Sequence, residues 1–173
     1  MNYADIKTVD IQDGEGVRVA LYVSGCHFHC KGCHNAVAWD FKYGKEYNED
    51  TTNYILDLLD KEYISGLSLL GGEPLEPTNQ EGLLPLVKKV KEKFPEKNIW
   101  CYTGYDFEKD VMGEMYGKNG VTKELLDHID VMVDGQFIES QKTVNGKFKG
   151  SDNQRILDVR RSIEENGIIK YEF

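Results

Sequence analysis

The sequence predicts an α/β fold, an open, partial (β/α) barrel with mostly parallel strands, formed by one domain over residues 1–173. Short apolar, β-branched segments alternate along the chain with longer amphipathic segments. Each apolar segment ends at or near a glycine, as is typical of strand–loop–helix units. Only four or five such strands are recognisable, so a closed eight-stranded barrel is too large and an open one fits.

The first half of the chain contains two of these strands. Val17–Val23 (VRVALYV) is predicted to be a buried strand, and residues 66–70 (GLSLL) a second one that stops at Gly71 and Gly72. Between them, Asp50 or Thr51 is expected to cap a helix with one apolar face. This is the first strand–helix–strand unit.

The second half repeats the pattern. Thr78 and Glu81 have capping-box spacing and predict the start of a helix, which Pro85 is early enough to tolerate. The remaining predicted elements are a strand at 98–103, helices at about 106–116 and from Thr122, and strands at 129–133 and 155–159. The polar segment 139–150 is expected to be a loop or an exposed hairpin.

Composition narrows the function classes. With 30 acidic against 21 basic side chains the net charge is −9, which disfavours binding to a phosphate backbone, so no nucleic-acid partner is expected. No apolar run approaches the roughly 18 residues of a membrane span, and the N-terminus has no secretion signal pattern. Four cysteines in such a chain indicate metal or redox use rather than disulfides, and we expect a cytoplasmic protein without a membrane partner.

Three of the four cysteines, Cys26, Cys30 and Cys33, lie within eight residues directly after the first predicted strand. Three thiolates can hold three irons of a cubane 4Fe–4S cluster and leave the fourth iron open to a small molecule. The alternative is a zinc site with His27, His29 or His34 as fourth ligand, although the second close pair of ligands usual for zinc is missing. The fourth cysteine, Cys101, lies in a predicted strand and is expected to be a buried small hydrophobe.

The second special segment is Gly71-Gly72-Glu73-Pro74. It could be only a tight turn between strand and helix, or the glycines could let a ligand approach the backbone while Glu73 accepts from an ammonium group. Thr103 and Asp134 also follow predicted strands and could be caps or ligand contacts. The carboxyl ends of parallel strands share one edge, so the sequence predicts a ligand site there.

The CxxxCxxC loop followed by a glycine–glycine–glutamate turn resembles the radical S-adenosylmethionine superfamily. Within it, five segments are similar to the glycyl-radical-enzyme activases that serve anaerobic ribonucleoside-triphosphate reductase. These segments are residues 13–35, 69–75, 99–105, 131–137 and 148–159. The resemblance covers most of the chain and implies the radical S-adenosylmethionine type of partial barrel.

The resemblance also implies roles for individual residues. Cys26, Cys30 and Cys33 would ligate one 4Fe–4S cluster, and Gly72 and Glu73 would contact the amino group of S-adenosylmethionine. The backbone around Gly32, Cys33 and His34 would lie against the adenine. The superfamily often has an aromatic residue at the position of Gly32, so His34 could take over that packing or be only a polar loop residue.

The implied activity is that of an oxidoreductase acting on a protein. The enzyme would cleave S-adenosylmethionine reductively and use the 5′-deoxyadenosyl radical to form a glycyl radical on the reductase, with reduced flavodoxin or a similar donor supplying the electron. Two alternatives stay open: a small radical S-adenosylmethionine enzyme acting on a metabolite, and a zinc-stabilised interaction module. The segment Asn153–Arg155 matches the same family without a role that the sequence explains.

Overall fold

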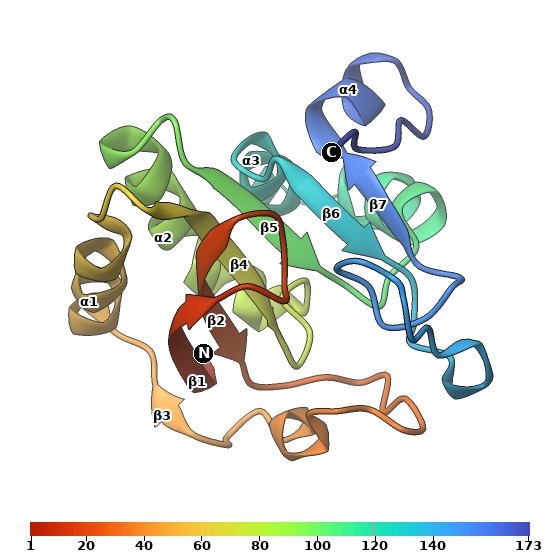
Figure 1. Cartoon of the computed structure of the whole chain (residues 1–173), viewed down its shortest axis with the longest axis horizontal. Coiled ribbons are helices and arrows are strands. Elements are labelled where there is room, and N and C mark those ends of the chain that lie inside the picture. The colour runs from red at the N-terminus through yellow and green to blue at the C-terminus, as the bar shows by residue number, and fades with distance from the viewer. Residues whose placement is uncertain (119) are drawn as a thin grey trace.

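The computed structural model describes residues 1–118 and 120–173. Its centre is a seven-stranded sheet with the order β3-β1-β2-β4-β5-β6-β7 (Figure 1). The strands are β1 (Asn2–Asp10), β2 (Val17–Val23), β3 (Lys45–Glu46), β4 (Ile64–Gly71), β5 (Asn98–Tyr102), β6 (Val131–Asp134) and β7 (Arg155–Asp158).

The predicted fold class, an open partial barrel of mostly parallel strands, is wrong, because the sheet is mixed. The pairs β2–β4, β4–β5 and β5–β6 are parallel. The pairs β1–β2, β1–β3 and β6–β7 are antiparallel, so half of the pairings run against the prediction.

The error has two physical causes. β1 (NYADIKTVD) is a largely polar strand in which only Asp10 is buried, so it lacks the apolar signal by which the other strands were recognised. The chain between β6 and β7 contains only a short 3-10 helix, Glu139–Gln141, and no crossover helix. Since parallel neighbours require a crossover, β7 returns beside β6 in the antiparallel direction.

Helix α1 (Glu49–Leu59) lies beside the sheet at the left of Figure 1, α2 (Pro77–Lys93) and α3 (Gly120–Asp127) lie behind the sheet, and α4 (Val159–Glu164) lies near the C-terminus. The first three bury one face of the sheet in a continuous apolar core. Alternate residues of the central strands β2, β4 and β5 point to that core, for example Leu21 of β2 and Leu69 of β4.

The helix starts differ from the sequence prediction, and α3 begins at Gly120 rather than at Thr122. Asn48, not Asp50 or Thr51, caps α1 by accepting from the Thr51 amide. The α2 helix begins at Pro77, whose missing N–H and fixed φ suit a first turn, so Thr78 lies inside the helix. The expected helix at 106–116 is a π-helix, Phe107–Met115.

The opposite face of the sheet is more polar and faces the loops. Arg18 is fully buried there, where its guanidinium donates to the Ser68 hydroxyl and to three backbone carbonyls and lies over the Trp100 ring. Within the described residues, none of the helices has the length and apolar character that crossing a bilayer requires.

Candidate functional site

A pocket of about 750 Å³ opens where the parallel strands β2, β4, β5 and β6 end. Among the residues named from the sequence, it is lined by Cys26, Cys30, Cys33, His34, Gly72, Glu73 and Thr103. Gly32 is not in its wall. The structure therefore brings the cysteine loop and the glycine–glutamate turn to one site, although they are far apart in sequence.

The cysteine loop, residues 26–33, leaves β2 and is held at its base by the segment that follows it. The Gly25 amide donates to the Ala38 carbonyl at 2.7 Å, and the Cys26 amide donates to the Trp39 carbonyl at 3.2 Å. The indole of Trp39 in turn stacks on the ring of His29, with centroids 4.4 Å apart. These contacts within the protein hold the base of the cysteine loop in place.

Burial and neighbouring backbone N–H groups act in opposite directions on the pKa of two of the three cysteines. Burial raises the pKa of Cys26 to about 11, and the backbone N–H groups of Phe28 and His29 oppose that rise. Burial also raises the pKa of Cys30, opposed by the N–H of Phe137. Bound cations reverse this balance, because a coordinating thiol is deprotonated by the metal.

The glycine–glutamate turn is joined to the base of the cysteine loop by two backbone hydrogen bonds. Gly72 N–H donates to the Val23 carbonyl, and Glu73 N–H donates to the Gly25 carbonyl, both at 2.8 Å. A Cβ atom on Gly72 would lie 2.6 Å from the Gly25 oxygen and 2.8 Å from the Ala38 oxygen. Only glycine fits at this position, because the two loops approach each other through the space that a side chain would fill.

The carboxylate of Glu73 is buried and is bound within the protein. One oxygen accepts from the Gly104 amide at 2.7 Å, and the other accepts from the Thr103 hydroxyl at 2.7 Å and the Leu75 amide at 2.9 Å. Burial nevertheless raises the pKa of Glu73 to about 7. Glu73 thus ties the turn after β4 to the turn after β5, and Thr103 is a partner in that link.

Gly32 lies outside the pocket wall, whereas His34 lines the pocket. Gly32 has φ +78°, in the left-handed region that favours glycine, and its Cα faces Glu139. An aromatic residue would be strained there, which gives a physical reason for the departure from the superfamily pattern. The His34 ring lies at the pocket wall against Phe137, with centroids 5.6 Å apart.

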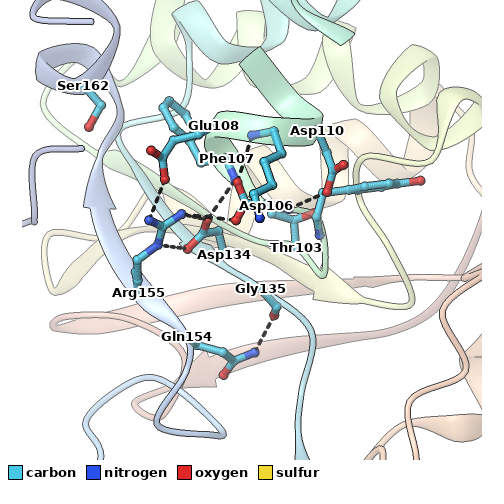
Figure 2. A network of polar contacts seen from close by, with 12 residues as sticks. Thr103, Asp106, Phe107, Glu108, Asp110, Asp134, Gly135, Gln154, Arg155 and Ser162 are labelled. Atoms are coloured by element: carbon cyan, nitrogen blue, oxygen red, sulfur yellow. Dashed lines mark hydrogen bonds and ion pairs between the residues drawn. The ribbon is translucent and has the colours of Figure 1, made fainter. Parts of the chain in front are cut away.

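Figure 2 shows the ion-pair network at the end of β6, where Asp134 receives the guanidinium of Arg155. Arg155 Nε donates to Asp134 Oδ1 at 3.1 Å, and Nη2 donates to Oδ2 at 2.6 Å. The buried carboxylate also accepts from the Phe107 amide at 2.8 Å, and Arg155 Nη1 donates to Glu108 at 2.8 Å. Asp134 is therefore a structural anchor for the turn after β5 and for the start of β7.

Sequence reasoning missed several residues of the site. Glu76, buried at the start of α2, accepts from the His27 amide at 3.1 Å and from its ring Nδ1 at 2.8 Å, and so holds the cysteine loop. Tyr102 and Trp39 line the pocket, and their buried hydroxyl and indole N–H have no partner within the part of the chain that the structure describes. No motif or spacing marks these residues in the sequence.

The site fits the two groups that the sequence implies. Three thiols that line one pocket match the ligands of an iron–sulfur cluster. Among the described residues, no three His, Cys, Asp or Glu side chains converge on a single ion position. A cubane cluster does not need that convergence, since each cysteine binds a different iron. The pocket volume suits a cofactor-sized molecule, and the two unpaired polar groups suit a polar one.

Comparison with known protein families first defines the class of protein. The family model of the 4Fe-4S single cluster domain matches residues 12–157, a range that contains the cysteine loop, the glycine–glutamate turn and the Asp134–Arg155 pair. The fold and the site are thus those of an iron–sulfur protein with one cluster.

Curated relatives then define the particular family, since they share the name anaerobic ribonucleoside-triphosphate reductase-activating protein. The relative from Enterobacteria phage T4 is 40% identical over 156 residues, covering 90% of this chain and 93% of that protein. Those from Haemophilus influenzae (39% identity, 90% and 97% covered) and Escherichia coli K12 (35% identity, 92% and 100% covered) match similarly. The chain belongs to the family of anaerobic ribonucleoside-triphosphate reductase-activating proteins.

Proposed function

We propose that this chain is a radical S-adenosylmethionine enzyme that activates anaerobic ribonucleoside-triphosphate reductase by generating a glycyl radical on it. The observation that carries the proposal is the meeting of Cys26, Cys30 and Cys33 with the Gly71–Gly72 turn in one pocket. The names of relatives that match nearly the whole chain support the choice of protein substrate. When bound, the cluster and S-adenosylmethionine supply reductive cleavage and the 5′-deoxyadenosyl radical that takes a hydrogen atom from the glycine.

In this proposal, some residues of the pocket bind the cluster and others orient S-adenosylmethionine. Cys26, Cys30 and Cys33 would hold the 4Fe–4S cluster, each through its sulfur. The backbone of Gly72 and Glu73 would meet the amino group of S-adenosylmethionine, because the Glu73 carboxylate is already occupied by Thr103, Gly104 and Leu75.

The adenine would lie beside the other end of the cysteine loop. Cys33 and His34 line that part of the pocket, and Gly32 would contribute only the backbone that shapes it. The Phe137 ring, which contacts His34, extends the apolar wall available to a flat ring.

The electron donor in this proposal is reduced flavodoxin or a similar low-potential protein. The site of action would be the cytoplasm, because a reducing compartment keeps cysteines available as thiolates for iron. Cysteines 26, 30, 33 and 101 are all free in the structure.

The test combines metal analysis with two product assays. The chain is reconstituted anaerobically with iron and sulfide and mixed with a strong reductant and S-adenosylmethionine, with and without the reductase. We expect about four irons per chain, 5′-deoxyadenosine in both mixtures, and a glycyl radical EPR signal only with the reductase. A folded, zinc-loaded, colourless protein would overturn the proposal, and cleavage without radical transfer would reject the reductase as substrate.

Cysteine variants assign the ligands. Cys26→Ala, Cys30→Ala and Cys33→Ala should each abolish cleavage, whereas Cys101→Ala should retain most of it. Cys101 is a matched control because it is fully buried in β5 among core residues. Loss of the cluster in Cys101→Ala with a folded chain would contradict the ligand set.

A further inference from the structure

A row of side chains from the four parallel strands lines the pocket. The row consists of Tyr22 from β2, Leu70 from β4, Tyr102 from β5 and Val133 from β6. The strand register pairs Tyr22 with Leu70 and Tyr102 with Val133, so these neighbours lie side by side. Cys101 belongs to the core on the helix-covered face, so Tyr102, the next residue of β5, points to the opposite face, where the pocket lies.

The hydroxyl of Tyr102 is a polar group without a partner in this row. Among the described residues, five buried side-chain polar atoms have no hydrogen-bond partner, and only those of Trp39 and Tyr102 belong to residues of the pocket wall. Tyr22, in the same row, donates its hydroxyl to Asp13 at 3.0 Å. Burial raises the pKa of Tyr102 above its ordinary value, so its hydroxyl stays protonated and can both donate and accept.

A buried hydroxyl without a partner lowers the stability of the folded chain, because the same hydroxyl is bound to water in the unfolded chain. Such groups are rare in proteins, and the places where they occur are often functional sites. Tyr102 is held on β5 between two hydrogen-bonded strands, β4 and β6, so its side chain starts from a rigid position. A ligand that offers a polar group at this place would satisfy the hydroxyl.

The place of β5 in the sheet indicates which part of S-adenosylmethionine meets the hydroxyl. This step rests on the proposed function, in which the amino group lies at Gly72, after β4, and the adenine lies beside Phe137, after β6. Because β5 lies between β4 and β6 (Figure 1), the ribose, which joins the two ends of the molecule, would lie over the end of β5. A ribose hydroxyl both donates and accepts, as the Tyr102 hydroxyl does.

We propose that the Tyr102 hydroxyl binds a ribose hydroxyl of S-adenosylmethionine. The hydroxyl is shielded from water and has no partner among the described residues, so the new bond replaces no contact within the protein. The contribution of Tyr102 should therefore be found in the affinity for the ligand and not in the stability of the ligand-free chain.

The test uses Tyr102→Phe, which removes one oxygen atom and keeps the ring. Tyr47→Phe is the matched control, because the Tyr47 hydroxyl lies 2.6 Å from the Thr52 hydroxyl and the Tyr47 ring packs on Tyr3. Anaerobic calorimetry on the reconstituted chain measures the binding of S-adenosylmethionine, and of 5′-methylthioadenosine in competition with it. The second ligand keeps the ribose and the adenine but lacks the amino and carboxylate groups. Urea unfolding of the iron-free chain measures stability.

We expect Tyr102→Phe to bind both ligands about twofold to tenfold more weakly, the factor that corresponds to one lost hydrogen bond. Its urea midpoint should equal or exceed that of the wild type, because a buried hydroxyl without a partner is gone. Tyr47→Phe should show the opposite pattern, a lower urea midpoint with unchanged affinity for both ligands, because it removes a hydrogen bond within the protein.

The other outcomes separate this inference from the proposed function. Unchanged affinity in Tyr102→Phe would overturn the inference, and so would weaker binding accompanied by a lower urea midpoint, since that is the pattern of a structural residue. Weaker binding of S-adenosylmethionine alone would place the hydroxyl at the methionine part and overturn the ribose contact, as would a failure of 5′-methylthioadenosine to compete in the wild type. A wild-type chain that holds its cluster but binds no S-adenosylmethionine would instead refute the proposed function.

Discussion

Removing Arg155 should destabilise the protein far more than its place near the surface suggests. The guanidinium makes two hydrogen bonds to the buried carboxylate of Asp134, whose only other donor among the residues that the structure describes is the Phe107 amide. In Arg155→Ala, Asp134 would remain as a buried charge with one donor, and Asp106 and Glu108 would lie nearby without their shared cation. Breaking a buried pair from one side costs about 3–5 kcal/mol, and we expect a loss in that range.

The assay is urea unfolding of the iron-free chain at pH 7, followed by circular dichroism, with Arg161→Ala as control. Arg161 faces Glu165 at 3.8 Å in an exposed pair, so its removal should cost less than about 1 kcal/mol. The double variant Asp134→Asn with Arg155→Ala carries no buried charge and should regain about 2 kcal/mol or more of the loss. A loss in Arg155→Ala as small as in Arg161→Ala would refute the reasoning, as would a double variant less stable than the single one.

Three further changes test the pocket. Glu73→Gln removes a carboxyl group whose pKa is raised from 4.5 to about 7. Because the folded state holds this proton more tightly than the unfolded state, the free energy of unfolding of the wild type should fall by about 3 kcal/mol more than that of the variant between pH 4.5 and pH 7. Urea unfolding measures this difference, and an equal pH dependence of the two proteins would contradict it. Gly72→Ala places a methyl group 2.6 Å from the Gly25 oxygen and should cost about 1–3 kcal/mol in the same assay. Gly117→Ala, with open space around it, should cost much less, and equal losses would rule out crowding as the cause. Glu76→Gln should speed amide exchange at His27, whereas the exposed Glu81→Gln should not; no change at His27 would mean that Glu76 does not hold the loop.

The strands with an apolar signal were predictable, and the others were not. β2 has the predicted bounds Val17–Val23, and β4, β5 and β6 overlap the segments predicted at 66–70, 98–103 and 129–133. β1 was missed because its residues are largely polar and only Asp10 is buried, and with it the mixed character of the sheet was missed. A strand stabilised by its backbone partners leaves little trace in composition.

The candidate site also has parts that the sequence predicts and parts that it does not. The cysteine loop and the glycine–glutamate turn have local spacing that carries chemical meaning, and both line the pocket. Glu76 and Phe137 contact His27 and His34 from distant positions in the sequence, and such contacts have no period or motif. The hydrogen bonds that occupy the Glu73 carboxylate are of this kind too, because they depend on the turn after β5.

The two backbone hydrogen bonds from Gly72 and Glu73 to the base of the cysteine loop also link the site to the pairing of β2 with β4. A parallel pair needs a crossover connection, and the intervening chain with α1 supplies it. In small zinc domains the ligand loops are joined through the metal, whereas here the cysteine loop and the glycine–glutamate turn are also joined through their backbones. The spacing of the two loops is therefore set by the sheet.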